Sequence, residues 1–233
     1  MIKTVIKLLI FAFLFANLSS CKTAKKTLVD SFQLQAGDLL FQDSDCGPFC
    51  TSIEKVTFGY KGAKLSHIGM VTFDDNNNIK IIEAISAGVV LTDLQTFLDR
   101  SEDSNGNPKV LVGRLDKNHR ALIPSAIHFA QGKLCLAYDE IFDITNNKYY
   151  CSELIYDAFT YAHDGVPLFN LQAMTFVDPD TGKTFPIWEK YYQDLGVKIP
   201  EGEAGLNPGG ISQSDYIDIV HVYGKPEGYQ ANH

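Results

Sequence analysis

The stretch KYYCSELIYDAF, residues 148–159, places a cysteine immediately ahead of a segment with helical periodicity. Cys151 is expected in or just before the first helical turn, where free backbone N–H groups and the helix dipole favour a negative charge. A thiol there ionises more easily than the reference pKa of about 8.5 allows, so Cys151 is a candidate nucleophile. The alternative is a buried apolar cysteine, the commoner role of a lone cysteine. The apolar positions that follow on one helix face are Leu154, Ile155, Ala158, Phe159 and Ala162.

A β-hairpin is predicted upstream of this helix. KLSHIGMVTF, residues 64–73, has a strand pattern, DDNNN turns the chain, and IKIIEAI, residues 79–85, returns it. Side chains alternate along a strand, so Glu83 shares a face with His67 in two registers. Pairing His67 with Glu83 sets them opposite each other, and pairing His67 with Ile85 sets them on a diagonal within side-chain reach. A shift by one residue separates them, and the sequence does not determine the register.

Histidine and glutamate among apolar neighbours need a partner. Burying either group alone is costly, and a hydrogen bond between His67 and Glu83 satisfies both. Such a bond holds one imidazole tautomer and favours the imidazolium, which is the role of the third member of a catalytic triad. A structural ion pair on the sheet explains the two residues equally well. Together with Cys151, however, the pair becomes a candidate catalytic base and its orienting group.

The chain opens with a signal-peptide pattern. MIKTVIKLLIFAFLFANLSSC has a short basic start, an apolar run from about Leu8 to Ala16, and small residues before Cys21. The run is too short to span a bilayer comfortably, so residues 1–20 are predicted to be a cleaved signal peptide. LSSC resembles the lipobox of bacterial lipoproteins, which implies a lipid on the sulfur of Cys21. Ordinary signal cleavage nearby is the alternative.

The rest of the chain is predicted to be a polar tether, residues 21–34, followed by one domain, residues 35–233. About 210 residues are enough for one sizeable core, and no repeat or low-complexity block divides them. The formal charge of −8 becomes −10 when residues 1–20 are removed with Lys3 and Lys7. Nucleic acid is not expected as a partner, because neutralising phosphates requires clustered Lys and Arg. The expected location is the bacterial cell envelope, on the periplasmic or surface side of a membrane.

Four cysteines follow Cys21. Cys46 and Cys50, in DSDCGPFC, are close enough to form a disulfide in an oxidising compartment if the loop turns tightly. Their spacing differs from that of a thioredoxin-type redox pair, so the bridge would be structural. A zinc site is not expected, since no second pair or nearby histidine completes the ligand set. Cys135, among apolar residues in GKLCLAYDEIF, is expected in the core.

Five stretches in a fixed order carry a family resemblance. They are QAGDLLFQ (35–42), LSHIGMV (65–71), IIEAISAGVVLTDLQTFLDR (81–100), AYDEIF (137–142) and YYCSELIYDAF (149–159). Together they resemble the circularly permuted papain-like cysteine hydrolases of the NlpC superfamily, in its YiiX-like branch. In ordinary papain-like enzymes the cysteine helix precedes the histidine strand. In the permuted branch the histidine comes first, as it does here.

The resemblance implies a permuted papain-like α+β fold, with the cysteine-bearing helix packed on an antiparallel sheet or small barrel. It implies Cys151 as nucleophile, His67 as general base and then acid, and Glu83 as the orienting group. Papain itself uses an amide side chain in that third role, so Glu83 departs from papain. The implied reaction is amide hydrolysis through a thioester, with no metal or organic cofactor. The backbone N–H of Cys151 is one oxyanion donor, and the sequence identifies no second one.

The resemblance says less about the substrate than about the reaction. Family kinship and an envelope location indicate cell-wall stem peptides or acylated amino acids. Two alternatives are a non-catalytic lipoprotein that binds wall peptides or lipids, and a lipid-directed acyltransferase, which would need an apolar cleft. Residues 43–64 and the segment after residue 165 are candidate cleft walls, although Phe176, Phe185 and Trp188 are expected mainly to pack.

Overall fold

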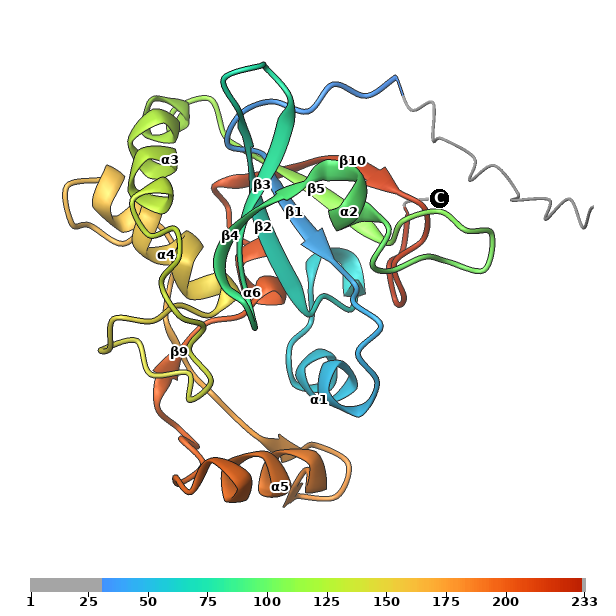
Figure 1. The fold of residues 1–233 in the computed structure, drawn as a ribbon. Coiled ribbons are helices and arrows are strands. Elements are labelled where there is room, and N and C mark those ends of the chain that lie inside the picture. The colour runs from blue at the N-terminus through green and yellow to red at the C-terminus, as the bar shows by residue number, and fades with distance from the viewer. Residues whose placement is uncertain (1–30, 232–233) are drawn as a thin grey trace, which may run out of the picture. The chain divides into compact units, whose positions relative to one another are not determined.

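A six-stranded antiparallel sheet forms the centre of the computed structural model, which describes residues 31–231 (Figure 1). The predicted signal peptide, residues 1–20, and the predicted lipidation at Cys21 lie outside the described residues. Every neighbouring pair of strands runs antiparallel in the order β10-β5-β1-β2-β3-β4. The strands are β1 (Leu39–Gln42), β2 (His67–Phe73), β3 (Ile79–Ile85), β4 (Gly88–Asp93), β5 (Val110–Leu115) and β10 (Ile217–Tyr223).

Within residues 31–231, six α-helices accompany this sheet. Helix α4 packs on β2 and β3 and against α3, so it is held between the sheet and a second helix (Figure 1). The helices are α1 (Pro48–Val56), α2 (Leu94–Leu98), α3 (Ile123–Gln131), α4 (Cys151–Ala162), α5 (Pro186–Leu195) and α6 (Pro208–Ser212). Short elements complete the chain: η1 (Tyr60–Gly62), η2 (Arg120–Leu122), and the two-stranded pairs β6 (Gln172–Ala173) with β9 (Ala204–Gly205) and β7 (Val177–Asp178) with β8 (Lys183–Thr184).

The predicted hairpin corresponds to β2 and β3. Val71 pairs with Ile81 and Met70 with Ile82, which is the register that sets Glu83 on the diagonal from His67. A one-residue slip would turn every apolar side chain of one strand to the wrong face, so burial on both faces excludes the registers that would separate His67 from Glu83.

Both faces of the sheet are buried. Ile68, Met70 and Ile82 pack in the cluster that contains the apolar face of α4. Val71 and Ile81 pack on the opposite face, against Phe97 of α2. Two buried faces explain why β2 and β3 read as nearly continuous apolar runs. By alternation, the side chains of His67 and Glu83 belong to the face away from α4.

A third cluster lies apart from the sheet. Phe176, Trp188 and Tyr192 form its buried centre, and Phe49 and Ile53 of α1 pack against it. The predicted helix around Trp188 to Leu195 is α5, and the aromatic residues of this segment pack as expected. Helix α5 therefore joins α1 rather than the main core (Figure 1).

Two expectations need correction. Phe32 stacks on the ring of His221 and Leu34 is buried, so the end of the predicted tether packs against the sheet. These apolar side chains extend the cluster on the α2 side of the sheet. Cys135 is exposed rather than in the core. It follows α3 in a tight turn, where its φ is 68° and its N–H donates to the carbonyl of Val89.

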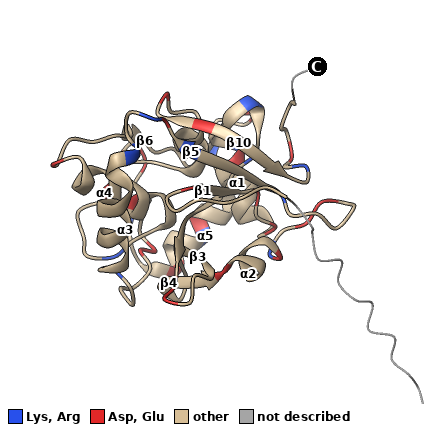
Figure 2. Ribbon diagram, turned by 90° about the horizontal axis from the view of Figure 1, so that it is seen from above, with Lys and Arg blue, Asp and Glu red and all other residues tan. Residues whose placement is uncertain are grey.

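Basic and acidic side chains are interspersed over the described part of the chain (Figure 2). Several of them pair across distant segments. Arg114 Nε donates to Asp38 at 2.7 Å, and Lys55 of α1 contacts Asp178 and Asp180, each at 2.7 Å. The second contact ties α1 to the β7–β8 pair, so it stabilises the same junction as the third cluster.

Candidate active site

Cys151 is the first residue of α4. The preceding Tyr150 is the N-cap residue, and its N–H donates to the carboxyl group of Glu153 at 3.2 Å. Helix α4 begins here because this capping contact satisfies one of the free N–H groups of the first turn. The free N–H groups that remain point toward the end where Cys151 lies, and they favour an anion there.

The thiol of Cys151 and the ring of His67 interact directly. Burial opposes ionisation of the thiol, but the hydrogen bond and positive charge of His67, together with the hydroxyl of Ser152 and the N–H of Ile68, lower the pKa of Cys151. Burial would likewise lower the pKa of His67, yet its hydrogen bonds to Cys151 and Glu83 raise that pKa to about 9. The lowered pKa of Cys151 and the raised pKa of His67 both favour a thiolate–imidazolium pair.

Glu83 lies on the far side of the imidazole. Its Oε2 is 2.6 Å from Nε2 of His67, which leaves Nδ1 as the ring nitrogen for Cys151. The His67 ring also lies 5.8 Å from the ring of Phe97, measured between centroids. Because His67 is the first residue of β2, its ring can reach the start of α4 although the strand directs it to the opposite face.

Arg100 and Thr92 hold the carboxylate of Glu83. The guanidinium donates from Nη1 to Oε2 at 2.6 Å and from Nη2 to Oε1 at 2.5 Å, and the hydroxyl of Thr92 donates to Oε1. The side chain of Glu83 is completely buried, which favours the neutral acid. The hydrogen bonds from His67 and Arg100 outweigh this and lower the pKa of Glu83 to about 2. Glu83 is thus a fixed carboxylate across the physiological pH range.

Gly69 leaves the space that this arrangement needs. It lies on β2 two residues after His67, so the two residues share a face of the sheet. A Cβ atom at this position would lie 2.4 Å from Cγ2 of Ile81 and 3.3 Å from Cε2 of Phe97. A side chain at residue 69 would therefore displace the neighbours that pack around the His67–Glu83 pair.

A cavity of about 610 Å³ opens beside Cys151 and His67. Both predicted walls contribute to it, through residues of the 43–64 segment and residues after 165. Its lining is mainly apolar and aromatic, and the residues of that kind are Phe49, Ile53, Val56, Ala84, Ile85, Tyr138, Phe142, Tyr150, Ala173, Met174, Phe176, Trp188, Tyr191, Leu206 and Pro208. Apart from His67 and Cys151, the lining contains two ionisable side chains, Arg100 and Glu140. The guanidinium of Arg100 is hydrogen-bonded to Glu83.

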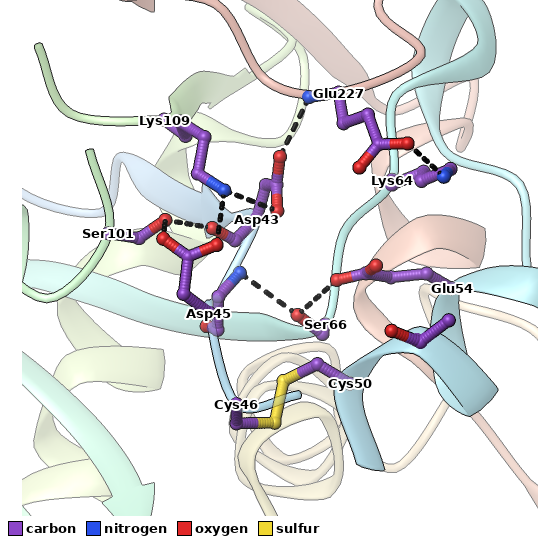
Figure 3. A network of polar contacts seen from close by, with 12 residues as sticks. Asp43, Asp45, Cys46, Cys50, Glu54, Lys64, Ser66, Ser101, Lys109 and Glu227 are labelled. Atoms are coloured by element: carbon purple, nitrogen blue, oxygen red, sulfur yellow. Dashed lines mark hydrogen bonds and ion pairs between the residues drawn. A yellow bond between two sulfur atoms is a disulfide. The ribbon is translucent and has the colours of Figure 1, made fainter. Parts of the chain in front are cut away.

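A disulfide joins Cys46 and Cys50 at one wall of the cavity (Figure 3). Beside it, the hydroxyl of Ser66 donates to Glu54 of α1 at 2.9 Å and accepts the N–H of Ser44 at 3.0 Å. Ser66 directly precedes His67. This network connects the disulfide loop and α1 to the start of β2, so it supports both the cavity wall and the strand that carries His67.

A second part of the network lies behind the loop. Lys109 contacts Asp43 at 3.1 Å and Asp45 at 2.6 Å, and the carboxylate of Asp43 also accepts the N–H of Glu227 at 2.7 Å (Figure 3). These contacts bring the segment before the disulfide against β5 and the chain end. Across residues 31–231, no group of three or more His, Cys, Asp or Glu side chains is arranged to hold a metal ion.

Comparison with known proteins identifies the class. Residues 33–221 match the Peptidase_C92 family, described as permuted papain-like amidase enzymes, YaeF/YiiX, C92 family. The chain belongs to this family, which confirms the predicted resemblance and the prediction of a cysteine peptidase or amidase. The order of the elements is the permuted one, with the histidine strand β2 ahead of the cysteine helix α4. No curated protein matches the chain.

A solved structure shows the same fold. The crystal structure of the metalloprotein yiiX from Escherichia coli O157:H7 superposes with a TM-score of 0.64 at 23% sequence identity, covering 82% of this chain and 98% of that one. The predicted α+β permuted papain-like fold is therefore confirmed. At this identity the likeness concerns the fold alone.

Sequence reasoning missed two residues that hold Glu83. Thr92 and Arg100 both lie in the stretch of residues 81–100 that carried the family resemblance. They stood out neither by spacing nor by type, because a threonine and an arginine ahead of a polar loop are common surface residues. Only their contact with a buried carboxylate shows what they do.

Proposed function

We propose that this chain hydrolyses an amide bond with Cys151 as nucleophile, His67 as general base and acid, and Glu83 as the group that orients His67. The observation that supports this most strongly is the pairing of the helix-start thiol with an imidazole whose other nitrogen contacts a fully buried carboxylate. A cysteine that only packs in the core does not require an imidazole–carboxylate pair beside its sulfur.

The reaction proceeds in two stages. The sulfur of the Cys151 thiolate attacks the substrate carbonyl carbon, and the carbonyl π electrons move to the oxygen. When the tetrahedral intermediate collapses, the C–N bond breaks and the leaving nitrogen takes the proton of the His67 imidazolium. Water then attacks the thioester carbon and gives a proton to His67, and the thiolate leaves. The products are an amine and a carboxylic acid, and the pair returns to its starting charge state.

The apolar cavity supports a substrate with an apolar group beside the scissile bond. A cell-wall stem peptide carries several charged groups, whereas the charged side chains of the lining are few and Arg100 is already bound by Glu83. An acylated amino acid fits better, because its acyl chain could fill the apolar region. The same observation favours a second function, a lipid-directed acyltransferase, in which an amine or alcohol replaces water in the second stage.

We further propose that the mature protein begins at Cys21 and is held in the bacterial envelope by lipid on that residue. The lipobox-like LSSC and the short apolar run before it support this. Between residues 31 and 231, no helix is long and apolar enough to cross a membrane. A lipid anchor would bring the cavity close to amphiphilic substrates without requiring a spanning segment.

The test uses acyl 4-nitroanilides of increasing chain length, acetyl, butyryl and octanoyl, with γ-glutamyl 4-nitroanilide as the charged comparison. We expect kcat/KM to rise about fourfold for each methylene that enters the cavity, from about 0.8 kcal/mol per buried methylene. The Cys151→Ala variant should lose this activity, and Cys135→Ser should retain it. Adding a lipid-like amine such as octylamine at submillimolar concentration separates the two functions, because only a transferase that binds the acceptor forms the octanoyl amide in preference to octanoic acid.

Three results would count against the proposal. Hydrolysis that survives Cys151→Ala would exclude the thioester route. Binding of the octanoyl probe without turnover would favour the non-catalytic binding protein. Faster cleavage of the γ-glutamyl compound than of the octanoyl compound would favour cell-wall stem peptides over acylated amino acids as the substrate class.

A further inference from the structure

Gln42 lies beside His67 on the neighbouring strand. Strands β1 and β2 are adjacent in the sheet (Figure 1), and Gln42, the last residue of β1, pairs directly with His67, the first residue of β2. Directly paired residues of an antiparallel sheet project to the same face, with Cβ atoms about 4.5–5.5 Å apart. The side chain of Gln42 therefore starts next to the imidazole that moves the protons of the proposed reaction.

One end of the Gln42 amide is fixed. Its Nε2 donates to the carbonyl of Phe97 at 2.8 Å, near the end of α2. Because a carbonyl oxygen accepts and cannot donate, this bond also assigns the two ends of the amide, with the nitrogen toward Phe97 and the oxygen away from it. Gln42 is completely buried, so its surroundings hold the amide in this orientation.

The other end of the amide has no partner. Oε1 of Gln42 is buried and makes no hydrogen bond to any residue in the range 31–231. Leaving a buried acceptor without a donor is costly, and most such atoms in folded proteins have one. Within that range, Nδ2 of Asn146 and Oγ1 of Thr160 share this state, but neither residue lines the cavity, whereas Gln42 does. A donor that enters the cavity can therefore satisfy Gln42.

The lining around His67 is polar. Ser44, Ser66 and Arg100 belong to it together with Gln42. The hydroxyl of Ser66 is already engaged both as donor and as acceptor, and the guanidinium of Arg100 has no acceptor atom. Oε1 of Gln42 differs from these groups, because it can accept a hydrogen bond and has no donor. This part of the cavity suits a small polar molecule with protons to donate, and the second stage of the proposed reaction requires one.

We infer that Gln42 is a catalytic residue that binds the water molecule which hydrolyses the thioester. This inference rests on the proposed function. After the first stage the leaving amine has taken a proton from His67, so the imidazole is neutral and can accept one. The water oxygen forms a bond to the thioester carbon, and one of its protons passes to His67. The second O–H donates to Oε1 of Gln42 and stays on the oxygen. The C–S bond then breaks, its electrons return to the sulfur, and the products are a carboxylic acid and the thiolate–imidazolium pair.

This role predicts a difference between water and an alcohol as the attacking molecule. Water has two O–H groups, one for His67 and one for Gln42. Methanol has a single O–H group, which His67 takes. Removing the oxygen of Gln42 should therefore slow the attack by water and leave the attack by methanol nearly unchanged.

Gln42→Met removes the acceptor and keeps the length of the side chain. The ester 4-nitrophenyl octanoate transfers its octanoyl group to Cys151, and intact-protein mass spectrometry of acid-quenched samples gives the rates at which the thioester forms and decays. We expect decay to be about tenfold slower than in wild type, the effect of losing one neutral hydrogen bond. Formation of the thioester and alkylation of Cys151 by iodoacetamide should stay within twofold. In dilute methanol, the ratio of methyl octanoate to octanoic acid should rise about tenfold.

Gln95→Met is the matched control. Gln95 is exposed on α2, where its amide donates to Asp99 at 2.7 Å, so this variant should keep thioester decay within twofold of wild type. If thermal unfolding shows that Gln42→Met is not folded, Gln42→Asn replaces it, because its amide oxygen is withdrawn by one methylene.

Thioester decay within twofold of wild type in the Gln42 variant, or an unchanged methanol ratio, would overturn the inference. Equal losses in the formation and the decay of the thioester would also overturn it, because Gln42 would then only support His67. If Cys151 of the wild-type protein acquires no octanoyl group, the proposed function fails first and this inference fails with it.

Discussion

The two free thiols of the described chain lie in contrasting environments. Cys151 is 8% exposed at the start of α4, in contact with His67, whereas Cys135 is exposed in the turn after α3. Exposure alone would make Cys135 the reactive residue. The partners of Cys151 reverse that expectation, because a thiolate is the nucleophile and the imidazolium stabilises it. Reactivity in this protein should therefore follow charge partners rather than access, and four predictions test that comparison.

The largest contrast is expected between the two cysteine substitutions. Cys151→Ser should lower kcat/KM for octanoyl 4-nitroanilide at least 10³-fold, since a serine hydroxyl beside His67 is a far weaker nucleophile at neutral pH than a thiolate. Cys135→Ser should change it less than twofold. Equal losses in the two variants, measured at matched thermal stability, would remove the distinction between the two regions.

The second prediction concerns the imidazolium. His67→Ala should lower kcat about 10²- to 10⁴-fold and should slow alkylation of Cys151 at pH 7 without affecting Cys135. In the wild-type enzyme, raising the pH through about 9 removes the proton of His67, so kcat/KM should fall there, while protonation of the thiolate lowers it on the acid side. A profile that keeps rising above pH 9.5 would show that Cys151 titrates without His67.

The third prediction concerns the support of Glu83. Arg100→Met should destabilise the fold by about 2 to 3 kcal/mol, at the low end for a broken buried pair because Arg100 is partly exposed. The lowered pKa of Glu83 contributes stability that is complete above its unfolded value of about 4.3 and is lost as the pH falls to about 2. The difference between wild type and variant should therefore be larger at pH 6 than at pH 2.5 in urea unfolding.

A matched variant separates charge from geometry. Arg100→Lys keeps the positive charge but cannot form the two-point contact with Glu83, so it should recover only part of the stability and activity. If Arg100→Met unfolds with the same difference at both pH values, the carboxylate of Glu83 is not held ionised by Arg100.

The smallest effect is expected at the disulfide. Replacing both Cys46 and Cys50 with serine should lower the free energy of unfolding by about 2 kcal/mol, as the bridge closes a short loop. Alkylation of Cys151 should change less than threefold, because the bridge supports the cavity wall and not the thiolate. A tenfold change in alkylation would instead place the wall in direct control of the nucleophile.

The sequence predicted the strand that carries His67 and the helix that starts at Cys151 better than it predicted the cavity. The period of the apolar residues after Cys151 predicted α4, and the turn signal at DDNNN predicted the β2–β3 hairpin. The register stayed open, because the sequence excluded neither the two registers that put His67 and Glu83 on one face nor the shifted one that separates them. In the structure Val71 pairs with Ile81 and Met70 with Ile82, which is the diagonal register.

Local patterns were misleading where the backbone turns sharply. Cys135 has apolar neighbours in the sequence, but its positive φ in the turn after α3 directs the side chain to solvent. Phe32 and Leu34 stand close to a polar segment, yet they join the cluster on the α2 side of the sheet. In both places the deciding contact is with a residue far away in the chain, which a short window of sequence does not contain.

The sequence by itself determined the strand that carries His67, the helix that starts at Cys151, their permuted order, and the chemical types of the thiol, the imidazole and the carboxylate. Periodicity and ordered motifs are local properties, and they can be read from neighbouring residues. Only the tertiary structure decided that Arg100 and Thr92 hold Glu83, and that residues of α1 and α5 line one apolar cavity. Those relations depend on which distant segments share one buried volume, and burial and hydrogen-bond satisfaction act on the whole fold at once.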